Sequence, residues 1–165
     1  MTLHELFEAI QNLPFAVAIA ESDKLFPTIE VIHVIALTMV VGTIAILDLR
    51  LLQVTGQDLS VMQVTKDVLP WTWGAFALAA ISGALMFSSK AVFYSESLPF
   101  RAKMLLMALA GLNMLLFHNT TYRTVAEWQG YPRLPSLARL AGTLSLLFWI
   151  GVVTFGRWVG FVDIQ

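Results

Sequence analysis

The sequence predicts an all-α fold: an antiparallel bundle of four membrane-spanning helices preceded by an amphipathic helix at the membrane surface. Of the 165 residues, 58% are hydrophobic and only 13% are charged, and the mean hydropathy is +0.75. A soluble domain is closer to half apolar and a quarter charged. A soluble chain of this length has too much surface to hide so many apolar side chains. The third observation is the presence of four apolar segments, each long enough to cross a bilayer.

Residues 1–24 are expected to form an interfacial amphipathic segment. Apolar side chains recur there at helical spacing, at Leu3, Leu6, Phe7, Ile10 and Leu13. The residues between them are largely polar, which is typical of a helix lying in the membrane surface. Pro14 is expected to kink or end this helix. The first basic residue is Lys24, so the segment lacks the positive start of a secretory signal.

Residues 25–165 are expected to form the four-helix membrane domain. The predicted spans cover about residues 28–52, 68–88, 100–122 and 136–161. A proline lies close to the expected start of each span, where this residue is tolerated: Pro27, Pro70, Pro99 and Pro135. Four spans place both termini on one side of the membrane. Lysine and arginine divide evenly between the two sides, so the positive-inside rule gives no orientation. Acidic residues are denser on the terminal side but contribute little to orientation, and we expect the termini outside.

Pairs of small residues predict close helix contacts. Ala79 and Gly83 on the second span, and Gly156 and Gly160 on the fourth, each lie four residues apart. Such pairs serve either packing within the bundle or association between copies. Because four helices bury little of one another, we expect a homo-oligomer surrounded by membrane lipid.

Composition excludes several function classes. The chain has no cysteine, which excludes disulfides, thiolate zinc sites, iron–sulfur clusters and covalently attached haem. Its net charge of −1 provides no basic surface for nucleic acid. The sequence also lacks a nucleophile–base pair, a phosphate-binding glycine loop and an HExxH motif, so nothing supports hydrolysis.

Two histidines within the predicted spans are the main candidate ligands. An ionisable side chain at the centre of a membrane costs roughly 2.5–3.5 kcal/mol on insertion scales, so such residues mark functional sites. Neutral imidazole is a common ligand of haem iron and copper, which makes His33 and His118 candidate metal ligands. At 1.5 Å per residue, the two lie at depths that differ by about 18–20 Å. We therefore expect two separate sites, one near each membrane surface.

Basic residues at similar depths are candidate partners for the propionates of a haem. Arg101, Lys103 and Arg157 are expected near His33, and Arg50, Arg123 and Arg139 near His118. A second axial ligand is less evident. His4 of the N-terminal helix, Met39, another chain or water are the options for His33.

Four sequence segments carry a family resemblance. They are "VIHVIALTMVVGTIAILDLRLL", "LPWTWGAFALAAISGALMF", "FRAKMLLMALAGLNMLLFH" and "FWIGVVTFGRWVGF". Together they resemble the spans of a small four-span bacterial membrane protein family of unassigned function. In outline the chain is similar to cytochrome b561-like b-type cytochromes and to the membrane domain of copper-resistance protein D. The b561-like resemblance implies that His33 and His118 are axial ligands of haem b in transmembrane electron transfer. The b561-type bundles pair histidines at matched depth, which this sequence does not.

Three functions remain open at the level of sequence. The first is a b-type cytochrome of the bacterial inner membrane, with periplasmic termini and a quinol or periplasmic redox partner. The second is copper or small-solute handling, because His33 with Met39, or His118 with Met114, offers soft ligands. The third is a structural or assembly subunit in which both histidines only pack.

Overall fold

Four long helices dominate the computed structural model, which describes residues 2–162. They are α3 (Leu25–Leu51), α4 (Val61–Ser89), α6 (Leu98–Asn119) and α8 (Ser136–Val162). The described residues contain no strand, so the predicted all-α fold is confirmed. Each of the four helical segments is long and apolar enough to cross a membrane. The chain is therefore a multi-pass membrane protein.

The helix boundaries differ most from expectation at α4. This helix starts at Val61 because the Ser60 hydroxyl accepts a hydrogen bond from the Gln63 backbone N–H at 3.1 Å. The polar first turns of the helix had been assigned to the connecting loop. As a result, Pro70 lies inside the helix and not at its start. At the same end of the bundle, the short helices η1 (Thr121–Thr124) and α7 (Val125–Trp128) follow α6.

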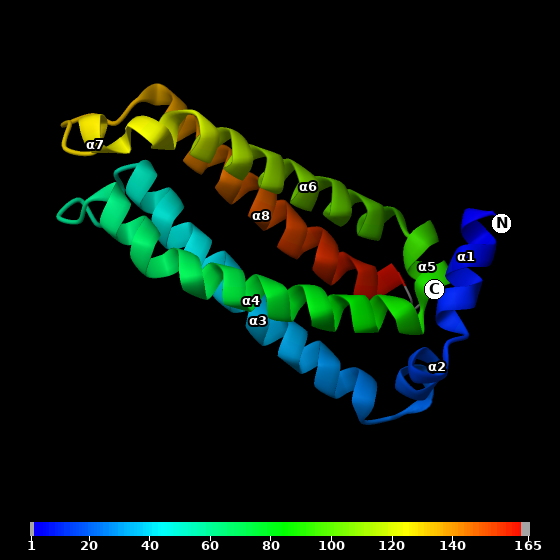
Figure 1. Ribbon diagram of the computed structural model, residues 1–165. Helices are drawn as coiled ribbons and strands as arrows, with labels where there is room; N and C mark the ends of the chain where they lie inside the picture. The colour runs from blue at the N-terminus through cyan, green and yellow to red at the C-terminus, as the bar shows by residue number, and fades with distance from the viewer. Residues whose placement is uncertain (1, 163–165) are drawn as a thin grey trace.

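The long helices form two antiparallel pairs, α3 with α4 and α6 with α8, as Figure 1 shows. The pairs join mainly where α3 packs on α8. A Cβ atom added at Gly142 of α8 would lie 3.2 Å from the Asp48 carbonyl oxygen of α3, so a glycine permits this close approach. By contrast, α4 and α6 have no extensive contact over the described residues. The bundle is therefore least closed between α4 and α6.

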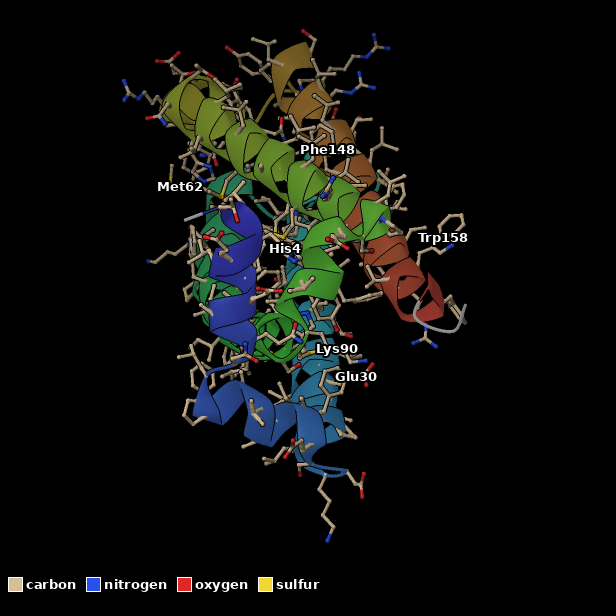
Figure 2. The ribbon with its side chains drawn as sticks, turned by 90° about the vertical axis from the view of Figure 1, so that its right-hand side faces the viewer. His4, Glu30, Met62, Lys90, Phe148 and Trp158 are labelled. Atoms are coloured by element: carbon tan, nitrogen blue, oxygen red, sulfur yellow. The ribbon has the colours of Figure 1, made fainter. Side chains whose placement is uncertain are left out.

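Three shorter helices lie at the end of the bundle where α3 begins and α8 ends. They are α1 (Leu3–Gln11), α2 (Pro14–Glu21) and α5 (Ala91–Glu96). Figure 2 shows α1 and α2 lying across this end, with His4 on α1 next to α5. Phe7 packs edge-on against Phe87 of α4 at 5.8 Å between ring centroids. The predicted amphipathic segment is thus two helices, which separate at the proline that begins the second.

The tryptophans of α7 and α8 face different surroundings. Trp128 and Trp149 are buried within the bundle, whereas Trp158 is 55% exposed and projects outward in Figure 2. The first two therefore find their packing partners inside one chain. Of the three, only Trp158 presents apolar surface to lipid or to another copy.

Candidate functional site

His33 is held on α3 by a hydrogen bond to the neighbouring helix. Its Nδ1 lies 3.0 Å from the Ser82 hydroxyl of α4. That hydroxyl already donates its single proton to the Leu78 carbonyl at 2.7 Å, so it accepts from His33. On this hydrogen-bond pattern we assign the ring hydrogen of His33 to Nδ1, which leaves the lone pair on Nε2. This is the arrangement of a metal-ligating imidazole, in which one nitrogen is oriented by a hydrogen bond and the other can bind.

Gly83 and Lys103 complete the surroundings of His33. A Cβ atom added at Gly83 would lie 3.0 Å from the His33 Cε1, so the glycine provides the space that the ring occupies. The Lys103 ammonium of α6 lies over the Phe100 ring at 5.4 Å and is also within electrostatic range of the His33 ring. Its side chain passes Gly156 of α8, where an added Cβ would lie 3.4 Å from the Lys103 Cδ. Four helices thus meet around a histidine and a cation.

The other two basic residues expected here make different contacts. The Arg101 Nε donates to the Ser95 carbonyl at 2.6 Å, which ties α6 to the end of α5. The Arg157 guanidinium lies over the Phe161 ring at 5.1 Å. Lys103 is therefore the member of this predicted group that the structure brings near His33.

His4 lies on α1, at the end of the bundle where α3 begins. Its Nε2 is 3.3 Å from Glu8 and its Nδ1 is 3.8 Å from Glu96. These contacts connect α1 with α5 and place the ring against carboxylates.

His118 occupies the last turn of α6, at the opposite end of the bundle from His33. Its Nδ1 lies 3.0 Å from the Met114 carbonyl oxygen, which can only accept, so Nδ1 carries the hydrogen. The lone pair is then on Nε2, which is buried and has no hydrogen-bond partner within residues 2–162. The rings of Phe117 and Tyr122 pack against the imidazole at 5.5 and 5.1 Å. These contacts orient a free acceptor nitrogen inside the membrane domain.

Asp48 on α3 is a second buried acceptor at this end. The residue is 4% exposed, and its Oδ2 makes no hydrogen bond to any described part of the chain. The Ser145 hydroxyl of α8 lies within hydrogen-bonding reach of the same carboxyl group. No ion pair involving Asp48 is found among the described residues. A buried carboxyl with one unsatisfied oxygen is costly, which makes Asp48 a candidate functional residue.

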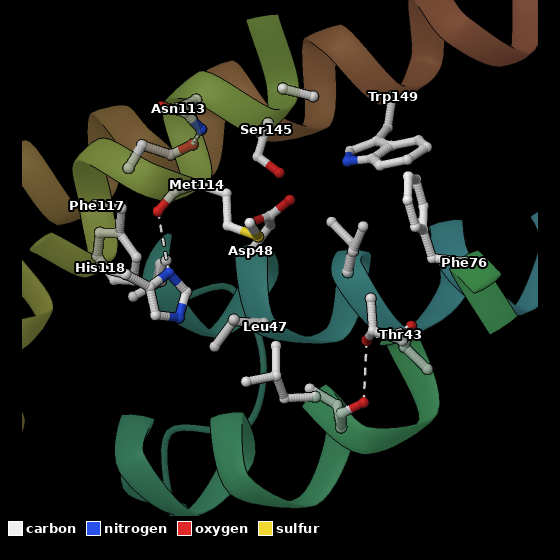
Figure 3. Close-up of a pocket in the computed structure, with 18 of the residues that line it drawn as sticks. Thr43, Leu47, Asp48, Phe76, Asn113, Met114, Phe117, His118, Ser145 and Trp149 are labelled. Carbon is white, nitrogen blue, oxygen red and sulfur yellow. Dashed lines mark hydrogen bonds between the residues drawn. The ribbon is translucent and has the colours of Figure 1, made fainter. Parts of the chain in front are cut away.

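A cavity of about 190 Å³ is lined by both His118 and Asp48. It is lined by residues of all four long helices, and Figure 3 shows His118 and Phe117 at one end of it and Trp149 and Phe76 at the other. Asp48 projects into the middle of the cavity. Most of the remaining lining is apolar.

The predicted basic partners of His118 do not line this cavity in the described structure. The Arg50 Nε donates to the Leu59 carbonyl at 2.7 Å, which holds the loop after α3. The Arg123 guanidinium reaches the Asn119 side chain at 3.4 Å. The two histidine sites therefore differ in their charged neighbours: Lys103 and Glu30 both lie within electrostatic range of His33, and His118 shares its cavity with the Asp48 carboxyl group.

Residues 24–162 match one protein family, described as a family of unknown function, DUF6644. The chain belongs to the DUF6644 family. A search of curated proteins and a search of solved structures both find no match. The family assignment agrees with the sequence resemblance to small membrane proteins of unassigned function. It establishes no link to cytochrome b561 or to copper-resistance protein D.

Sequence reasoning about this DUF6644 protein missed three site residues. Ser82 orients His33, Gly83 makes room for its ring, and Asp48 shares a cavity with His118. The small-residue pair Ala79 and Gly83 had predicted a close helix contact on the face of α4 that carries Ser82 and Gly83, but not a site for an imidazole. Only the packing of α3 against α8 shows that the Asp48 carboxyl faces a cavity.

Proposed function

We propose that this DUF6644 protein is an integral-membrane b-type cytochrome in which His33 is an axial ligand of haem b. The observation that carries the proposal is the tautomer of His33, which leaves the Nε2 lone pair available for iron. A hydrogen-bonded Nδ1 is the usual second-shell partner of a ligating histidine.

The residues around His33 fit a haem in donor type and charge. Gly83 leaves room for the imidazole beside α4, and Lys103 would provide a cation for a propionate. A bound haem b would supply one-electron chemistry between ferric and ferrous iron. The chain would contribute the ligand, the low-dielectric surroundings and the nearby charge, which together set the reduction potential.

We extend the proposal to the location and the assembly of the protein. We place the protein in the bacterial inner membrane with its termini in the periplasm, so that His33 lies towards the periplasmic side and can serve a periplasmic redox partner. We also propose a homo-oligomer. The outward-facing Trp158 and Phe161 of α8 offer an apolar contact surface, and another copy is one source of the second iron ligand.

A visible spectrum of the detergent-purified protein tests the proposal. Protein from haem-replete cells is expected to show a Soret band that sharpens and shifts on reduction with dithionite. His33→Ala should abolish the band, whereas His118→Ala, the matched control, should retain it. A colourless, iron-free wild-type preparation would reject the cytochrome function. Loss of the band in His118→Ala alone would move the haem to the other end of the bundle.

Copper handling is the second candidate, and a specific observation favours it. Met107 and Met114 line the same cavity as His118, which places two thioethers and an imidazole around one space. Soft ligands of this kind select copper(I). No group of three histidine, cysteine or carboxylate side chains forms a metal site in residues 2–162, so the thioethers are essential to this alternative. Metal analysis that finds copper without haem would support it. If both histidine variants leave the spectrum, metal content and phenotype unchanged, a structural subunit is the remaining function.

A further inference from the structure

The cavity at the His118 end has the chemistry of a site for a neutral molecule that donates hydrogen bonds. The His118 Nε2 carries a lone pair and no hydrogen, so it requires a donor from its ligand. The unsatisfied Oδ2 of Asp48 is a second buried acceptor in the same cavity. Two acceptors separated by an apolar space fit a molecule that carries a hydroxyl group at each of two positions.

Charge and size restrict the ligand further. A carboxyl group in the cavity and the lack of any lysine or arginine along its described lining disfavour an anion. The volume of about 190 Å³ is below the roughly 300–1,000 Å³ of pockets that enclose drug-sized ligands. A cavity of about 150 Å³ holds a benzene ring, so this one suits a single substituted ring and not a porphyrin. The aromatic ring of Phe117, which lines the cavity beside His118, is suited to packing against such a ring.

The open side of the bundle provides a route from the lipid. Residues of α4 and of α6 line the cavity on facing sides, yet these two helices have no extensive contact with each other. An apolar tail attached to the ring would therefore extend between α4 and α6 into the bilayer. A molecule dissolved in the membrane would reach the site without crossing water.

We propose that this cavity binds a quinol, a 1,4-dihydroxy aromatic ring with an apolar tail, whose hydroxyl groups donate to Asp48 and His118. The role of this quinol as electron partner of the cytochrome rests on the proposed function. Its binding depends only on the cavity and requires no haem.

Binding of decylubiquinol to the full-length protein tests this assignment. The purified protein is reconstituted in lipid nanodiscs without quinone and titrated under anaerobic conditions, and the tryptophan fluorescence is followed because Trp73 and Trp149 line the cavity. We expect saturable binding, with decylubiquinol bound about tenfold more tightly than decylubiquinone. The quinone offers no hydroxyl donor to either acceptor.

Three variants and two matched controls locate the site. Asp48→Asn should weaken quinol binding about tenfold, and His118→Phe about 3–10-fold. Gly111 lines the cavity, and an added Cβ there meets nothing within 4 Å, so Gly111→Leu should fill the space and weaken binding at least tenfold. Asp67→Asn removes an exposed carboxylate of α4, and Gly74→Leu adds the same bulk outside the cavity. Both controls should bind as the wild type does.

The outcomes separate this site from the haem proposal. Quinol binding is expected to persist in His33→Ala. The visible spectrum of that variant tests only whether His33 binds haem. Quinol affinity that is unchanged in Asp48→Asn and Gly111→Leu would overturn the assignment, as would equal affinity for the quinone. It would also fail if mass spectrometry of the purified protein finds a phospholipid that decylubiquinol cannot displace, or if copper occupies His118.

Discussion

The Ser82 hydroxyl of α4 accepts a hydrogen bond from the His33 Nδ1 of α3 at 3.0 Å, and this contact fixes which ring nitrogen can bind a ligand. It also joins two helices within the membrane. Interhelical hydrogen bonds in membrane proteins contribute about 0.6 kcal/mol on average, so the main consequence of this one is the orientation of the imidazole.

Ser82→Ala is therefore expected to weaken haem binding by about 10–100-fold with little change in stability, because second-shell partners orient metal ligands. Titration of the haem-free protein with haem, followed at the Soret band, measures the effect. Ser88→Ala is the control, since within residues 2–162 the Ser88 hydroxyl bonds only to the Leu85 carbonyl of its own helix. If the two variants bind haem equally, Ser82 has no orienting role.

Gly83→Ala is expected to displace the His33 ring. The added methyl group would lie 3.0 Å from Cε1, which is closer than nearly all carbon contacts in proteins. We expect a shifted or weakened Soret band in a protein that still inserts and folds. Gly74→Ala on the same helix adds its methyl group where nothing lies within 4 Å and should give the wild-type spectrum. A wild-type spectrum in Gly83→Ala would show that the ring moves freely.

Gln53 connects the two halves of the bundle at the end opposite α1. Its side-chain Nε2 donates to the Pro132 carbonyl at 3.0 Å, and its Oε1 accepts from the Leu134 N–H at 3.2 Å. Its backbone has a positive φ of 60°, which favours glycine. Gln53→Ala loses both bonds and keeps the unfavourable φ, and should reduce the free energy of unfolding by about 1–3 kcal/mol.

Denaturant titration in detergent measures the stability of Gln53→Ala. The Gln57→Ala control removes a bond from the Gln57 side chain to the Gln53 carbonyl within the same loop, and should cost less than about 1 kcal/mol. Equal stability of the two variants would mean that Gln53 does not hold the halves together.

Both chain ends are expected on one side of the membrane, because the described chain contains four spans. Alkaline phosphatase fused to either end should be active if our proposed periplasmic orientation is correct, since this enzyme is active only after export. Fusion within the Gly56–Ser60 loop should give the opposite result. Activity at one end only would contradict the four-span topology, and activity at the loop alone would reverse the orientation.

Some features of the site follow from sequence, and others do not. His33 and His118 can be identified as unusual from sequence because an imidazole within an apolar span is costly wherever the helix packs. Their positions along α3 and α6 also place them at opposite ends of the bundle. Which nitrogen each ring presents could not be predicted, because it depends on Ser82 in another helix and on a carbonyl one turn away.

Composition and periodicity by themselves determined that this chain is an all-α, four-span membrane protein, because helices long enough to cross lipid must satisfy their own backbone hydrogen bonds. Only the tertiary structure decided that Asp48 and His118 share one cavity, that Lys103 lies near His33, and that Arg50 and Arg123 turn to other partners. The physical reason is that side chains from different helices meet according to helix rotation and the close approach at glycines, which hydropathy along a single span does not encode.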